Sequence, residues 1–212
     1  MKKILLVDDH AILRQGVIKI LQEIMEMPVL FEEASDGIQA IKMTETGEYD
    51  LVLLDISLPD QNGLIVLKQI QQRHPKLPVI ILSSHSEEHY TVRTLRAGAS
   101  GYVSKGCDAV VLKEAIEKVL SGKKYVSPAQ ADLLAEAICD NRYTASPHET
   151  LSDREYQLAC MITSGKTLTE IARELSLSVK TTSTYRTRIL EKLNLRTTAD
   201  IISYCIQHNL SL

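Results

Sequence analysis

The feature that most constrains the fold of this sequence is a regular alternation, over residues 1–122, of short apolar runs with amphipathic stretches. The apolar runs are residues 4–7, 29–31, 51–54, 79–82 and 101–103. Between them, apolar residues recur at helical spacing, most clearly in residues 13–24 and 111–120. Parallel strands need crossover connections, so strands and helices in alternation predict a five-stranded parallel sheet with helices on both faces. This part of the chain is therefore predicted to be a doubly wound α/β domain.

The remainder of the chain predicts a linker and a second, smaller domain. Residues 123–148 contain two prolines and a polar tract, and the Ala-rich segment 129–139 within them predicts a helix. Residues 149–212 contain four short helical patterns. Three begin with a hydroxyl residue three positions before a carboxylate, the capping-box arrangement, and Ser178 caps the third helix. We predict domains over 1–122 and 149–212, the second an all-α helix-turn-helix domain.

Composition excludes several classes of protein. With 44% hydrophobic and 24% charged residues, the chain matches a globular protein rather than a disordered one. Lys2 and Lys3 precede an apolar run, but Asp8 ends it too early for a signal peptide, and no apolar stretch approaches the roughly 20 residues of a membrane helix. We expect a cytoplasmic protein. The cysteines are widely separated, which favours buried free thiols over disulfides or zinc ligands. They are Cys107, Cys139, Cys160 and Cys205.

Acidic residues follow the predicted strands where a ligand is expected. In an open α/β sheet, ligands bind at the carboxyl ends of the strands. Asp8 and Asp9 follow the first apolar run, Asp55 the third and Ser83 the fourth, and Lys105 lies just past the fifth. Crowded carboxylates need a neutralising cation, and oxygen ligands favour Mg²⁺. A metal on Asp9 and Asp55, with Lys105 beside it, would hold a phosphoryl group, so the pattern predicts phosphoryl transfer to Asp55.

Basic residues concentrate in one short segment near the C-terminus. Residues 1–122 carry 13 Lys and Arg against 17 Asp and Glu, whereas residues 149–212 carry 8 against 7. Within the second range, residues 178–193 hold four basic residues and one acidic residue. A basic helix in an otherwise acidic protein indicates a local nucleic-acid contact.

The faces of this basic helix follow from helical spacing. Thr182, Ile189 and Leu193 are predicted to face the core, whereas Ser183, Thr184, Thr187 and Arg188 share an exposed face that can enter a major groove. Three basic side chains can reach phosphates, and these are Lys180, Arg186 and Arg188. Hydroxyl side chains read bases weakly, so the DNA sequence that is bound does not follow from them.

Residues 2–122 resemble the CheY-like receiver domain of two-component response regulators. The likeness lies in Asp8-Asp9, in the stretch from Asp55 to Gly63, in Ser83-Ser84 and in residues 97–105. The resemblance implies that Asp55 accepts a phosphoryl group from a histidine kinase and that the domain binds Mg²⁺. It further assigns Asp8, Asp9 and the Ser57 carbonyl, with Asp55, to the metal, Ser83 and Tyr102 to the conformational switch, and Lys105 to the phosphate.

Residues 149–210 resemble the LuxR-type helix-turn-helix, and the whole chain resembles the NarL/FixJ class of response regulators. The likeness lies in residues 151–155, 165–172, 177–181 and 189–193. Thr182 stands where the family commonly has an apolar residue, and Tyr185 where it commonly has His, which puts transferred base contacts in doubt. The resemblance implies binding to double-stranded DNA and control of transcription. The residues expected at the DNA are Lys180, Thr181, Ser183, Thr184, Tyr185, Arg186, Thr187 and Arg188.

An apolar stripe on the last helical pattern predicts a further contact. It consists of Ile201, Ile202, Cys205 and Ile206. The small domain can bury this stripe internally, but the resemblance implies a dimer contact, so we expect a homodimer when the protein is phosphorylated or bound to DNA.

Two other functions are compatible with parts of the pattern. An aspartate-nucleophile phosphatase also uses paired acids, Mg²⁺ and a lysine, but it needs Asp-x-Asp after the first strand and a sizeable cap domain, which we do not find. A constitutive DNA-binding protein would not need the complete acidic set with Lys105. We therefore expect phosphoryl transfer to the protein's own Asp55 without separate catalytic turnover.

Overall fold

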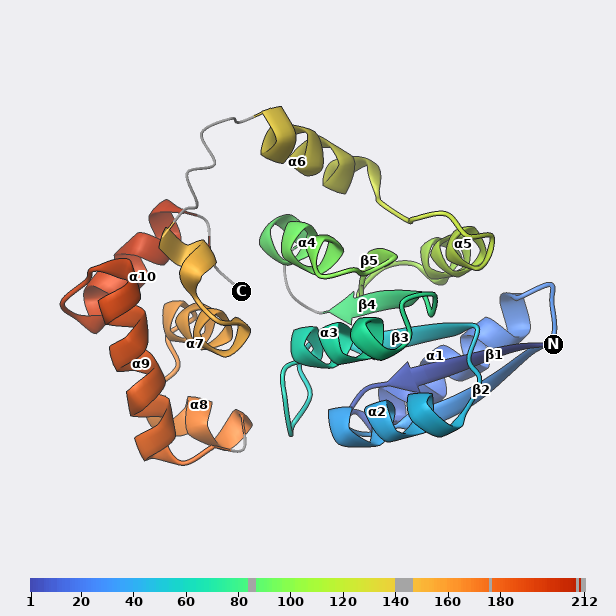
Figure 1. The fold of residues 1–212 in the computed structure, drawn as a ribbon, viewed down its shortest axis with the longest axis horizontal. Coiled ribbons are helices and arrows are strands. Elements are labelled where there is room, and N and C mark those ends of the chain that lie inside the picture. The colour runs from blue at the N-terminus through green and yellow to red at the C-terminus, as the bar shows by residue number, and fades with distance from the viewer. Residues whose placement is uncertain (84–86, 140–146, 176, 209, 211–212) are drawn as a thin grey trace. The chain divides into compact units, whose positions relative to one another are not determined.

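The structure is a computed structural model that describes residues 1–83, 87–139, 147–175, 177–208 and 210. The chain divides into two compact units, residues 1–133 and 134–212 (Figure 1), and each is described by itself.

The first unit is built on a parallel sheet in which strands and helices alternate (Figure 1). Its strands are β1 (Lys2–Val7), β2 (Val29–Ala34), β3 (Leu51–Asp55), β4 (Val79–Ser83) and β5 (Gly101–Ser104). Its helices are α1 (Ala11–Ile24), α2 (Gly37–Thr46), α3 (Gly63–Arg73), α4 (Glu87–Arg96) and α5 (Ala109–Leu120), and α6 (Pro128–Cys139) begins within it. All pairings are parallel, in the order β2-β1-β3-β4-β5, which confirms the predicted doubly wound α/β fold.

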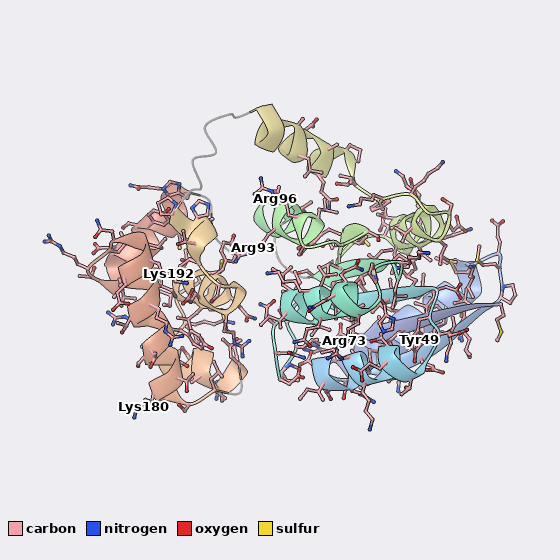
Figure 2. The ribbon with its side chains drawn as sticks, viewed as in Figure 1. Tyr49, Arg73, Arg93, Arg96, Lys180 and Lys192 are labelled. Atoms are coloured by element: carbon pink, nitrogen blue, oxygen red, sulfur yellow. The ribbon has the colours of Figure 1, made fainter. Side chains whose placement is uncertain are left out.

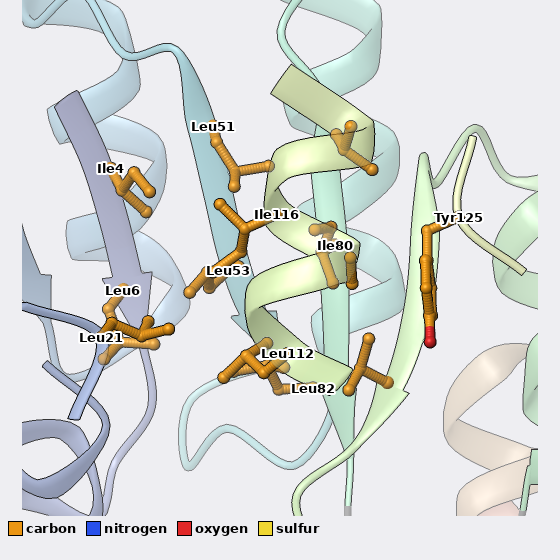
Figure 3. Close-up of a cluster of buried hydrophobic side chains, with 13 residues drawn as sticks. Ile4, Leu6, Leu21, Leu51, Leu53, Ile80, Leu82, Leu112, Ile116 and Tyr125 are labelled. Atoms are coloured by element: carbon orange, nitrogen blue, oxygen red, sulfur yellow. The ribbon is translucent and has the colours of Figure 1, made fainter. Parts of the chain in front are cut away.

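Both faces of the central strands are buried, which explains why residues 4–7, 51–54 and 79–82 are all apolar. Alternate strand residues, among them Ile4, Leu53 and Ile80, pack with Leu21 of α1 and Ile116 of α5 in one core cluster (Figure 3). The intervening residues of these strands are buried as well. The carboxyl ends of the strands therefore form a rigid edge that positions whatever side chains follow them.

Besides the last residues of α6, the second unit contains four helices and a short 3-10 turn in its described residues. These elements are η1 (Pro147–Thr150), α7 (Asp153–Thr163), α8 (Leu168–Glu174), α9 (Val179–Leu193) and α10 (Thr198–Gln207). Every predicted cap is present: Ser152, Thr167 and Thr197 each form a reciprocal capping box, and Ser178 accepts from Thr181 N–H at the start of α9. The cap sequences thus determine where these helices begin.

A partly buried ion pair joins α7 to α9. The Glu155 carboxylate accepts from the Ser152 N–H at 2.7 Å and from Lys192 Nζ at 2.6 Å. Burial raises the pKa of Glu155, but the hydrogen bonds from Lys192 and Ser152 outweigh it, so the pKa lies below its ordinary value. Lys192, one of the basic residues counted in the segment 178–193, is therefore engaged within the domain.

The cysteine prediction holds for two of the four residues. Cys160 and Cys205 are buried free thiols, as predicted. Cys107 is a free thiol but only half-buried, because it lies near the exposed start of α5. The side chain of Cys139 lies outside the described residues. None of the helices described is both long and apolar enough to cross a membrane.

Candidate functional site

The side chains expected at one edge of the sheet do meet there. Asp8 follows β1, Asp55 ends β3, Ser83 ends β4 and Lys105 follows β5. The parallel register pairs Val7 with Leu54, and Asp55 with Leu82, so the acidic residues follow neighbouring strands at nearly the same level. The register of the central strands therefore brings these side chains together.

Lys105 bridges two buried carboxylates. Its Nζ lies 2.6 Å from Asp8 Oδ2 and 2.8 Å from Asp55 Oδ2. The Asp8 and Asp55 side chains are 1% and 2% exposed and that of Lys105 is 9% exposed. Removing charge from water is costly unless opposite charges and hydrogen bonds compensate. Two carboxylates share one ammonium, so the pocket keeps an uncompensated negative charge that suits a cation.

The pKa values of this group reflect burial opposed by charge. Burial raises the pKa of Asp55 above its ordinary value, although Lys105 and the Ser57 N–H oppose the shift. Burial alone would lower the pKa of Lys105, but Asp55 and Asp8 outweigh it and keep the pKa above its ordinary value. Lys105 therefore stays charged at neutral pH. Ionisation of the buried Asp55 carboxylate, by contrast, destabilises the fold.

The raised pKa of Asp55 predicts a pH-dependent stability effect of Asp55→Asn. An acid with a raised folded-state pKa contributes stability below its unfolded pKa and loses it as the pH rises through the folded value. In metal-free buffer we expect Asp55→Asn to be more stable than wild type at pH 7 and the difference to shrink as the pH falls toward the ordinary range of aspartate. Urea unfolding across a pH series measures this.

Asp50→Asn is the matched control for that series. Hydrogen bonds from Lys2 and Lys3 lower the pKa of Asp50, so its ionised form stabilises the fold and its replacement should reduce stability at pH 7. If Asp55→Asn lowers stability at pH 7 as Asp50→Asn does, the burial cost assigned to Asp55 is wrong.

Asp9 lies at the exposed side of the same pocket. One ligand atom each from Asp8, Asp9, His10 and Asp55 lie within 4.8 Å of one another. His10 Nδ1 is 2.7 Å from Asp9 Oδ1 and 3.2 Å from Asp8 Oδ1, and the His10 N–H donates to Asp8. Three carboxylates in such a group match the oxygen donors that Mg²⁺ prefers.

The turn after β3 supports the Asp55 carboxylate through backbone hydrogen bonds. The Ser57 N–H donates to Asp55 Oδ1 at 3.1 Å, and Ser57 forms an antiparallel bridge with Asn62. The Gly63 N–H donates to the Ile56 carbonyl at 2.8 Å. This places the backbone of Gly63 directly against that of Asp55, and the stretch 55–63 becomes a compact support for the carboxylate.

Ser83 and Tyr102 are both fully buried. Ser83 pairs in the sheet with Ser104, and its carbonyl accepts from the Lys105 N–H at 2.8 Å. Tyr102 lies further back in β5, opposite Ile81. Ser83 thus belongs to the edge that carries the carboxylates, whereas Tyr102 belongs to the strand beside it.

The second unit presents α9 as its basic helix. Thr182, Ile189 and Leu193 are buried, as predicted. Lys180 is exposed and points away from the first turn of α9 (Figure 2). The remaining exposed residues of the predicted face are Thr184, Thr187 and Arg188, whereas Thr181, Ser183, Tyr185 and Arg186 are half-buried.

Two of the half-buried side chains on α9 already have partners. Arg186 Nε donates to Thr198 Oγ1 at 2.7 Å, which holds Arg186 against α10. The guanidinium of Arg188 lies 5.9 Å from the centre of the Tyr185 ring, within the range of a cation-π contact. Lys180 and Arg188 are therefore better placed than Arg186 to contact phosphates.

Comparison with known proteins finds two families that match separate parts of the chain. Residues 4–117 match the family model of the response regulator receiver domain, and residues 149–205 match that of the luxR family of bacterial regulatory proteins. The chain belongs to the response regulators. Response regulator UvrY of Escherichia coli K12 is 37% identical over 99% of this chain and 96% of its own length. Response regulator GacA of Pseudomonas syringae pv. syringae is 33% identical over 99% and 98%.

The solved structures that resemble this chain are response regulators as well. RcsB of Salmonella typhimurium is 25% identical, with a TM-score of 0.58, and the match covers 96% of this chain and 97% of RcsB. A LuxR-family two-component response regulator from Aurantimonas is 32% identical, with a TM-score of 0.59, over 65% of this chain and 98% of its own. These matches confirm the NarL/FixJ-class architecture, a receiver domain followed by a LuxR-type DNA-binding domain.

The sequence pattern did not single out His10 in the acidic pocket, nor Arg14 and Asp60, which support the loops around it. His10 directly follows Asp9, but a single histidine in a sequence carries little signal. Arg14 Nε donates to Glu33 at 2.8 Å, and a guanidinium N–H of Arg14 donates to the Asp8 carbonyl, which fixes the loop that carries both acids. Asp60 accepts from the N–H groups of residues 37 and 38, so it ties the turn after β3 to the start of α2.

Proposed function

We propose that this response regulator accepts a phosphoryl group on Asp55 from a histidine kinase, and that phosphorylation controls dimerisation, DNA binding or both. The observation that supports the acceptor assignment is the shared ion pair of Lys105 with Asp8 and Asp55 in a buried pocket. A buried carboxylate with a raised pKa, such as Asp55 beside Lys105, at the carboxyl edge of a parallel sheet is typical of a functional site. Labelling of the full chain with a small phosphodonor tests the assignment.

The residues of this pocket fit a Mg²⁺ ion. We assign it to Asp8, Asp9 and Asp55 with the carbonyl oxygen of Ser57, because all four offer hard oxygen donors. When bound, Mg²⁺ would neutralise the carboxylates and the phosphoryl oxygens. Lys105 balances the charge of another phosphoryl oxygen, and the Ser57 N–H holds the Asp55 carboxylate in place.

In the proposed step, one carboxylate oxygen of Asp55 attacks the phosphorus of a phosphohistidine. The new O–P bond forms as the P–N bond breaks, and the donor imidazole leaves with the bonding electron pair. The protein's contribution is position and charge rather than a general base. We infer no further catalytic turnover, since the product stays on Asp55 until it is hydrolysed.

The hydrogen bonds that phosphorylation adds approach the free energy needed to shift a conformational equilibrium. A phosphoryl group adds negative charge and three acceptor oxygens. Two new charge-assisted hydrogen bonds, assigned to Ser83 and Lys105, contribute roughly 1.5 to 3 kcal/mol each, against the ~5.5 kcal/mol that moves an equilibrium from 1:99 to 99:1. We assign Tyr102 to follow Ser83 in this switch.

We propose that α9 enters the major groove of double-stranded DNA and that the protein binds as a homodimer. RcsB of Salmonella typhimurium interacts with DNA, and we extend that property to this chain. On α10, Ile201 and Cys205 are buried within the domain, but Ile206 is 60% exposed and is left for a dimer contact. The predicted DNA residues share α9, with Lys180 and Arg188 as the main phosphate contacts.

Lys180→Ala and Arg188→Ala should each weaken DNA binding and flatten its salt dependence. Each lost phosphate contact lowers the slope of log K against log salt by roughly 0.9. Titration of a promoter fragment at several salt concentrations measures this. Lys19→Ala, which replaces an exposed lysine on α1 outside the helix-turn-helix domain, is the control. An unchanged slope would remove the substituted residue from the DNA interface.

A further inference from the structure

A buried amide after α5 contacts the strand that carries the predicted switch aromatic. Gln130, in the first turn of α6, is only 1% exposed. Its Nε2 donates to the carbonyl oxygen of Tyr102 in β5 at 3.1 Å. Buried amides are retained where their hydrogen bonds are satisfied, because an unsatisfied one is costly. The acidic pocket makes no use of Gln130, so its burial needs another explanation.

The same side chain also fixes the start of α6. The Ser127 N–H donates to Gln130 Oε1 at 3.0 Å, and the Gln130 N–H donates to Ser127 Oγ at 3.2 Å. This is a capping box, with Pro128 at the first helical position, where its fixed φ is favourable. One amide therefore uses its oxygen to hold the helix and its nitrogen to hold the strand.

The chain just before α6 covers the same edge of β5. The Tyr125 N–H donates to the Ser100 carbonyl at 2.8 Å, and Tyr125 forms a parallel bridge with Gly101. Tyr125 is 6% exposed, and its side chain belongs to the core cluster (Figure 3). A Cβ on Gly101 would lie 3.2 Å from Tyr125 Cβ, so the glycine permits this close approach. We call residues 123–130 the connector; it caps an edge strand that would otherwise be open.

We propose that Gln130 is a positioning residue that couples the state of Tyr102 to the start of α6, the helix that leads toward the DNA-binding domain. The coupling rests on the proposed phosphorylation of Asp55. When β5 shifts at Tyr102, either the Gln130 amide loses its buried acceptor or the capped start of α6 moves with the strand. β5 and the start of α6 therefore change conformation together. Phosphorylation of Asp55 shifts this shared equilibrium by acting on β5.

Three variants of the full chain separate coupling from simple stability. Gln130→Met keeps the volume but removes both hydrogen bonds. Gln130→Glu keeps an acceptor for the Ser127 N–H and removes the donor to Tyr102. Ser127→Ala, the matched control, removes the hydroxyl cap and leaves the bond to Tyr102. Amide hydrogen exchange of residues 124–139 is measured with and without acetyl phosphate and Mg²⁺, together with phosphate incorporation.

In wild type we expect phosphorylation to change exchange at the start of α6 by about fivefold or more, the range of local opening equilibria. Both Gln130 variants should incorporate phosphate normally and lose this change. Ser127→Ala should exchange faster overall and retain it. If wild type incorporates phosphate without altering α6, or the Gln130 variants respond as wild type does, the coupling role is wrong. If wild type incorporates no phosphate, the proposed function fails, and the coupling role fails with it.

Discussion

Asp55→Asn is expected to reduce the incorporation of acid-labile phosphate by about 100-fold or more, the usual scale for loss of a covalent nucleophile. The amide has nearly the same shape as the carboxylate but lacks its negative charge and its nucleophilic oxygen. The fold should survive, because the substitution removes a carboxyl whose ionisation is costly in this pocket. The measurement is labelling of the full chain by acetyl phosphate in Mg²⁺, with an acid and alkali stability test of the bound phosphate.

Asp50→Asn provides a matched control for this labelling. Asp50 directly precedes β3, whereas Asp55 is its last residue. The two substitutions therefore lie at opposite ends of the same strand. The Asp50 carboxylate bonds Lys2 and Lys3 and has no place in the proposed chemistry. The Asp50→Asn variant should therefore incorporate as much phosphate as wild type does. Equal labelling of Asp55→Asn and Asp50→Asn would show that the phosphate resides on another residue.

The fold and the acceptor pocket follow from the sequence for the same physical reason. Apolar runs with helical stretches between them specify parallel strands, and the carboxyl ends of parallel strands meet at one edge. The residues after those runs, Asp8, Asp55 and Lys105, therefore had to converge, and in the structure they lie within ion-pair distance. The caps of α7 to α10 were predictable because capping is local in sequence.

What the sequence pattern did not predict depends on tertiary contacts. Tyr125 docks on β5 because β5 is an edge strand of the sheet. The spacing of apolar residues in the sequence does not specify the order of the strands. Gln130 follows a serine and a proline in a recognisable capping box, but its bond to Tyr102 joins residues 28 positions apart. The partial burial of Arg186 likewise reflects Thr198 on another helix.

Gly63→Ala should be among the most damaging single substitutions in the receiver domain. A Cβ at Gly63 would lie 2.1 Å from the Asp55 carbonyl oxygen and 2.7 Å from Ile56 Cα. Both are backbone atoms, so no side-chain rotation relieves the overlap, and the turn after β3 must move. We expect a loss of roughly 3 kcal/mol or more in the free energy of unfolding, the range of severe steric substitutions. Urea unfolding measures it.

The same displacement should reach the chemistry, because the backbone that must move carries Asp55. The Gly63 N–H bond to Ile56 and the Ser57 bond to Asp55 lie in one short turn, so relief of the overlap displaces the carboxylate from Lys105. Phosphate incorporation by the folded fraction should therefore fall as well. Gly16→Ala is the control, since a Cβ there meets nothing within 4 Å and alanine favours the helix α1 by up to about 1 kcal/mol. If Gly63→Ala is as stable and as readily labelled as Gly16→Ala, the close backbone approach does not position Asp55.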